Sequence, residues 1–259
     1  GIENFASVAF PTTAPSDLRI HLGSGWTQTN FSVLGYSSNG TNATTTSFTP
    51  DWKFDTIRIW AQNASGNGDN VAVNINGGAT LSTVSNNALN TSIFSVDVTC
   101  PLGQNTINLV PANSGSGKNF TLIGIEAFDS TNYQVRVTNY GLGGRLAGSL
   151  AATNGSNQLG DLITAYAPDL SIVEIGLNDA IGAVSIPSFV ASMQTVITNC
   201  KASGDVILVT GHPVTSVLGT LPNYNAALKA LAFANGCGFI DLFKDWGSLE
   251  TTGSALGYY

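Results

Sequence analysis

The sequence predicts two architectures in one chain, an antiparallel β-sandwich over residues 1–130 and a three-layer α/β domain over residues 131–259. Before residue 131 the apolar residues come in short alternating bursts separated by turns rich in Gly, Asn and Ser, and no window has helical periodicity. After residue 131, apolar strands alternate with longer helical segments, which is typical of α/β proteins. The length of 259 residues, well above the roughly 150 of an average domain, allows this division.

The strands of the first half are short and alternate apolar with polar positions, which favours a sandwich of the jelly-roll kind. We expect strands at FDTIRIWA (54–61), NVAVNING (70–77), IFSVDVT (93–99), NTINLV (105–110) and FTLIGIEAF (120–128). The segment LRIHL (18–22) is expected to begin the sandwich.

The second half is predicted to hold a parallel sheet covered by helices. Its strands are QVRVTN (134–139), LSIVEI (170–175), DVILVT (205–210) and FIDLF (239–243), and the middle two are the continuous apolar runs that a sheet buried on both faces requires. Three amphipathic helices join them, with apolar spacings around Leu162, Met193 and Leu228. Function is then expected at the carboxyl ends of the strands.

Composition excludes several classes of function. Nine basic and sixteen acidic residues give a net charge of −7 and no basic cluster, so nucleic acid is not an expected partner. No apolar run approaches the roughly 18 to 20 residues that cross a bilayer, so membrane insertion is not expected. Only 10% of residues are charged, against about 25% in average proteins, while Gly is abundant. This composition is typical of an extracellular or virion location.

The cysteines and acidic residues give no sign of a metal or organic cofactor. Cys100, Cys200 and Cys237 lack the CxxC spacing of zinc sites, and no calcium-loop spacing is present. The thiols are expected to be buried, and a disulfide between Cys200 and Cys237 stays an open alternative because both precede predicted parallel strands.

Three strand ends carry the residues of interest. The strands run into YGLGGR (140–145), GLNDA (176–180) and GHPV (211–214). Glycines allow a close backbone approach or a positive φ, and an Asn held in a tight turn can aim its amide at a developing negative oxygen. Taken singly, each motif is also compatible with an ordinary structural turn.

The order of these motifs resembles the SGNH (GDSL-type) hydrolases over residues 131–259. The resemblance rests on N-x-G-x-x-G at 139–144 and G-x-N-D at 176–179. It implies a flavodoxin-like α/β fold in which Gly144 donates its backbone N–H, and Asn178 its side-chain amide, to the oxyanion of ester hydrolysis. Asp179 would brace the loop. The preceding β region resembles sandwich modules of SGNH-type proteins in bacteriophage tail fibres and spikes.

The sequence departs from this family at two motifs, because it contains neither the GDS of the nucleophile nor the D-x-x-H of the base. We therefore expect the chain to be truncated at both ends. In the strand order 2-1-3-4-5, a strand should lie between 134–139 and 170–175. Ser24 after LRIHL and His212 after DVILVT are weak candidates for the missing nucleophile and base, and no carboxylate partner of His212 is evident in the sequence.

The resemblance implies a serine esterase or deacetylase that acts on an acylated bacterial surface polysaccharide. Trp26 and Trp52 of the sandwich could stack on a sugar ring, whereas Trp60 is expected in the core. The alternative is a glycan-binding or structural virion module with a degenerate hydrolase fold. The fibre-like composition favours a homo-oligomer such as a trimer.

Overall fold

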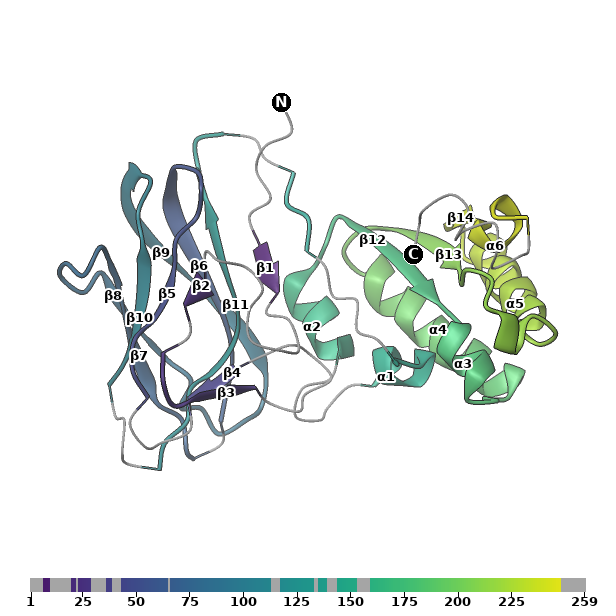
Figure 1. Cartoon of the computed structure of the whole chain (residues 1–259), viewed down its shortest axis with the longest axis horizontal. Coiled ribbons are helices and arrows are strands. Elements are labelled where there is room, and N and C mark those ends of the chain that lie inside the picture. The colour runs from purple at the N-terminus through teal and green to yellow at the C-terminus, as the bar shows by residue number, and fades with distance from the viewer. Residues whose placement is uncertain are drawn as a thin grey trace. The chain divides into compact units, whose positions relative to one another are not determined.

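The chain forms two compact units, residues 1–141 and 142–259, in the computed structural model (Figure 1). The structure describes residues 7–9, 20–21, 23–28, 36–38, 43–64, 66–112, 117–132, 135–138, 144–152 and 159–247. Separate clusters of buried apolar side chains stabilise the two units.

The described strands of the first unit form two antiparallel sheets. The first sheet has the order β3-β4-β11-β6-β9, with β1 also paired to β11. Its strands are β1 (Ser7–Ala9), β3 (Trp26–Gln28), β4 (Tyr36–Ser38), β6 (Phe54–Gln62), β9 (Ile93–Gly103) and β11 (Thr121–Phe128). The second sheet has the order β2-β5-β10-β7-β8. Its strands are β2 (Ile20–His21), β5 (Thr46–Phe48), β7 (Asn70–Ile75), β8 (Ser82–Ser85) and β10 (Ile107–Pro111).

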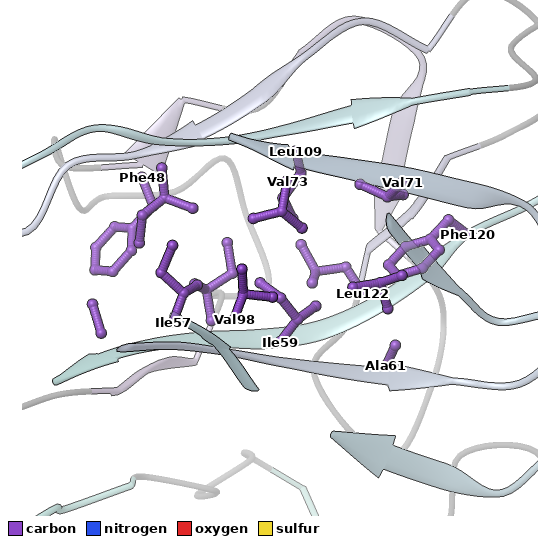
Figure 2. Close-up of a cluster of buried hydrophobic side chains, with 14 of the residues drawn as sticks. Phe48, Ile57, Ile59, Ala61, Val71, Val73, Val98, Leu109, Phe120 and Leu122 are labelled. Carbon is purple, nitrogen blue, oxygen red and sulfur yellow. The ribbon is translucent and has the colours of Figure 1, made fainter. Parts of the chain in front are cut away.

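The two sheets enclose one hydrophobic core, shown in Figure 2. Ile57 and Ile59 of β6 are fully buried in it, while Arg58 between them points to the other face and binds Asp97 of β9 at 2.6 and 2.8 Å. This alternation follows from the two-residue period of a strand. The opposite sheet contributes residues such as Phe48 and Leu109. The predicted antiparallel β architecture of this half is therefore confirmed.

The segment LRIHL belongs to the sandwich as expected. Its described residues, Ile20 and His21, pair with Phe48 and Ser47 of β5. A strand in this position is not available to fill a gap in the parallel sheet.

The second unit contains a parallel sheet in its described residues, with the order β12-β13-β14. Its strands are β12 (Leu170–Ile175), β13 (Asp205–Thr210) and β14 (Gly238–Ile240). The helices are α1 (Ala147–Ala151), α2 (Leu159–Tyr166), α3 (Leu177–Ile181), α4 (Ile186–Lys201), α5 (Leu221–Ala234) and α6 (Leu242–Asp245), with a 3₁₀ turn at Thr215–Val217. Both α4 and α5 contact β13 (Figure 1). The three strands confirm a parallel sheet, and the five-strand flavodoxin-like order stays a prediction.

The predicted strand QVRVTN is wrong for its described residues, 135–138, which form no strand. The alternating pattern predicted that Val135 and Val137 face a hydrophobic core, but their side chains are 75% and 50% exposed. Arg136 instead ties this segment to the sandwich. Its guanidinium donates to Glu126, which is 1% exposed, at 3.1 Å, and lies 5.2 Å from the centre of the Phe128 ring.

The last predicted strand is shorter than FIDLF. It ends at Ile240 because the Asp241 carboxylate accepts from Lys244 N–H at 3.2 Å and thereby caps α6. Phe243, which the sequence places in the strand, lies in α6 and donates its N–H to Thr210 Oγ1 at 3.0 Å.

Cys100, Cys200 and Cys237 all lie in the described residues, and all are free thiols. Cys200 is buried as expected, and this burial raises the pKa of its thiol. The same expectation is wrong for Cys100 and Cys237, which are half-buried. None of the helices in the described ranges has the length and hydropathy of a membrane span.

Candidate active site

Asn178 lies at the carboxyl end of β12, in a turn that requires glycine. Gly176 has φ +110° and is followed at once by α3, which begins at Leu177. A Cβ at Gly176 would lie 3.5 Å from Phe189 Cζ and 3.6 Å from Tyr224 Cβ. The positive φ disfavours any other residue there. This turn places the half-buried Asn178 at the edge of the sheet where ligands bind in α/β proteins.

Asp179 joins this turn to α1. Its side chain is fully buried, and its two carboxylate oxygens accept from Ala147 N–H at 3.2 and 3.1 Å. Burial raises the pKa of Asp179, and the hydrogen bond from Ala147 lowers it less. The carboxylate therefore satisfies the first N–H of α1 and fixes that helix against α3. This contact confirms that Asp179 braces the loop.

Gly144 lies three residues before Ala147, in a turn with φ +79°. It is exposed, and nothing lies within 4 Å of the position of an added Cβ. The Asp179–Ala147 contact thus links the segments that carry Gly144 and Asn178. That their two N–H donors converge on one oxyanion stays a prediction, and residues 139–143 of the motif lie outside the described ranges.

The buried carboxylate makes a testable prediction about pH. Because the pKa of Asp179 is raised in the folded protein, its contribution to stability is greatest below the ordinary carboxyl pKa and falls as pH rises through the folded pKa. Asp179→Asn keeps an acceptor for Ala147 N–H but removes the charge. We expect the stability of this variant relative to the wild type to increase as pH rises from about 4 to 7. Urea unfolding at several pH values measures this difference, and a difference that is constant or falls with pH would contradict it.

His212 follows β13 at the same sheet edge and has a carboxylate partner that the sequence did not reveal. Its Nδ1 lies 3.4 Å from Glu174 Oε1 of β12, and its ring centre lies 5.8 Å from that of Trp246. The sequence does not reveal this partner because Glu174 lies 38 residues before His212, and only the pairing of β12 with β13 brings the two together.

Ser24 is not positioned as the nucleophile of the parallel sheet. It lies in the turn between β2 and β3 of the sandwich, and its Oγ is 3.2 Å from Thr44 Oγ1. The short strand before it pairs within the sandwich, so the weak assignment of Ser24 is corrected.

The sandwich tryptophans are used mainly in packing. Trp26 is 8% exposed and belongs to the core, so the prediction that it stacks on a sugar is wrong, because stacking needs an open ring face. Its indole N–H donates to Thr44 O at 2.8 Å. Trp52 is half-buried, donates to Ala127 O at 2.9 Å and packs edge-on against Phe48, and its sugar-binding role stays a prediction. Trp60 is 5% exposed, as expected, and donates to Glu126.

The described ranges contain no group of three or more His, Cys, Asp or Glu side chains that could hold a metal ion. The candidate site consists of the predicted donors Gly144 and Asn178, the Asp179 carboxylate that binds Ala147 N–H, and the neighbouring pair of Glu174 and His212.

A family model described as the GDSL-like lipase/acylhydrolase family matches residues 125–257. No curated protein sequence matches the chain. Among solved structures, a family two carbohydrate esterase from Cellvibrio japonicus is 12% identical, with 90% of this chain and 87% of that chain covered and a TM-score of 0.34. One from Clostridium thermocellum in complex with cellohexaose is 10% identical, with 85% and 87% covered and a TM-score of 0.32.

The CBM36-1 domain of a multidomain xylanase from the hindgut metagenome of Trinervitermes trinervoides is 20% identical. It covers 40% of this chain and 84% of its own, with a TM-score of 0.32. These three TM-scores are too low to establish a shared fold or function.

Proposed function

Because the chain belongs to the GDSL-like lipase/acylhydrolase family, we propose that it serves in the hydrolysis of a carboxylic ester, with Asn178 and Gly144 as the oxyanion donors. The observation that carries this proposal is the Gly176 turn, which holds Asn178 at the carboxyl end of β12 while Asp179 fixes the segment that follows Gly144.

In the proposed mechanism, a serine hydroxyl attacks the ester carbonyl carbon while a histidine takes its proton. The carbonyl oxygen becomes an anion in the tetrahedral intermediate and accepts from Asn178 Nδ2–H and Gly144 N–H. The intermediate collapses as the histidine protonates the departing alkoxide. Water then attacks the acyl-enzyme by the same route and releases the acid.

We propose that the serine and this histidine come from polypeptide other than these 259 residues. The sequence contains no GDS or D-x-x-H motif. Among the described strands, β12 pairs with β13 alone, and its Leu170 and Ile172 are 49% and 65% exposed. The backbone N–H and C=O groups on the other edge of β12 therefore have no partner among the described strands, which favours a further strand beside it. The exposed Leu170 and Ile172 mark a face of β12 that further polypeptide can cover. In the family, the strand expected there is the one that carries the serine.

The proposed substrate is an acyl ester, most simply an O-acetyl group, on a bacterial surface polysaccharide. We propose that the protein is part of a phage tail fibre or spike and that it acts outside the cell as a homo-oligomer. Support for this finer proposal comes from the uncharged polar composition and from the resemblance of the sandwich region to tail-fibre modules. A non-catalytic glycan-binding module is the second candidate, which the missing catalytic motifs favour.

A serine-directed fluorophosphonate tests the enzyme proposal on the natural protein. We expect one covalent adduct by intact mass and a parallel loss of p-nitrophenyl acetate hydrolysis. Absence of both the adduct and hydrolysis would instead support the non-catalytic module.

A further inference from the structure

Glu174, His212 and Trp246 form a cluster at the carboxyl edge of the parallel sheet. Glu174 extends from β12, His212 follows β13, and Trp246 follows α6. The carboxylate lies 3.4 Å from His212 Nδ1, and the imidazole and indole rings are 5.8 Å apart at an angle of 43°. We call these three residues the Glu174 cluster.

The cluster is accessible in the second unit. The side chains of Glu174 and His212 are 50% and 33% exposed, and Trp246 is half-buried. Glu174 also lies on the same side of β12 as the exposed Leu170 and Ile172, since side chains alternate along a strand.

The cluster lies next to the turn of Asn178. Ile175 is paired with Thr210, so β12 and β13 end level with each other. A Cβ at Gly211 would lie 3.3 Å from Leu177 Cβ, which shows that the segment after β13 lies close to the start of α3. His212 directly follows Gly211, and Asn178 directly follows Leu177 in α3.

The chemistry of the cluster suits a neutral, hydroxyl-rich ligand. A carboxylate accepts strong hydrogen bonds from hydroxyl groups, and half of the Glu174 side chain is exposed to receive them. An indole ring provides an apolar surface beside these polar groups. The negative charge of Glu174 disfavours an anionic ligand.

We propose that the Glu174 cluster binds a neutral pyranose ring of the substrate. This ring would lie next to the ester carbonyl whose oxygen accepts a hydrogen bond from Asn178. Its place in catalysis rests on the proposed ester hydrolysis, whereas the binding itself does not. The cluster would then place sugar recognition in the same unit as the oxyanion donors.

The test is an NMR titration of the full chain with methyl β-D-glucopyranoside, methyl β-D-galactopyranoside and methyl β-D-xylopyranoside in turn. The sequence has two histidines, and His21 in the sandwich serves as the internal reference. We expect at least one glycoside to shift the His212 ring signals saturably while those of His21 stay unchanged.

Variants identify the contacts. Glu174→Gln keeps the shape of a half-exposed side chain and should weaken binding about tenfold or more. Trp246→Ala should weaken it similarly. The matched control is Asp205→Asn, which removes an exposed carboxylate at the opposite end of β13 and should leave the affinity unchanged.

The possible outcomes separate the two proposals. If no glycoside shifts His212, or if Glu174→Gln binds as tightly as the wild type, the sugar site is overturned. If the sugar binds as expected but the natural protein hydrolyses no ester, the sugar site stands and the esterase proposal fails.

Discussion

Asn178→Ala should lower kcat/KM for ester hydrolysis about 100- to 1000-fold in the natural protein. The variant lacks one of the two donors that stabilise the negative charge on the carbonyl oxygen in the transition state. Asn178 is half-buried in the short helix α3, and its side chain has no place in the buried core cluster. We therefore expect the folded state to be retained. Initial rates with p-nitrophenyl acetate and thermal unfolding together measure both effects.

The matched control for this variant is Asn223→Ala, which removes an exposed Asn from the first turn of α5 in the same unit. It should keep the wild-type rate. A rate loss below about tenfold for Asn178→Ala, or an equal loss in both variants, would contradict the assignment of Asn178 as a donor.

Phe189→Ala should destabilise the second unit by about 3 to 5 kcal/mol. Phe189 is fully buried in α4, and its ring meets that of Tyr224 edge-on with 5.2 Å between centres. Its ring also lies close to the Gly176 turn, since Phe189 Cζ would be 3.5 Å from a Cβ added at Gly176. The variant leaves a cavity at this point, so we expect a lower urea midpoint and a loss of ester hydrolysis.

Phe233→Ala is the control for this loss of stability. Phe233 lies in α5 of the same unit but is 71% exposed, so its removal should change the free energy of unfolding by less than about 1 kcal/mol. Similar losses in the two variants would contradict the described core.

The spacing of apolar residues along the sequence correctly predicted those strands and helices whose apolar side chains are buried in a hydrophobic core. The strand 54–61 alternates because Ile57 and Ile59 enter the sandwich, and α4 follows the helical spacing of Phe189 and Met193. The same rule failed at residues 135–138. Their valines alternate, but the segment is held by Arg136 and Glu126 through a side-chain contact that no local pattern encodes.

The candidate site was predictable where it rests on local turns and hidden where it rests on strand pairing. The G-x-N-D motif identified Asn178 and Asp179 from the sequence. The partnership of Glu174 with His212 depends on residues 38 positions apart. Burial of Trp26 was likewise not predictable, because a tryptophan at a strand start can face the core or the solvent.

The most direct test of the central claim is a crystal structure of the natural protein after reaction with the fluorophosphonate. The account predicts a phosphonylated serine whose phosphoryl oxygen lies about 3 Å from both Asn178 Nδ2 and Gly144 N. A phosphoryl oxygen that contacts neither donor would contradict the proposed oxyanion site.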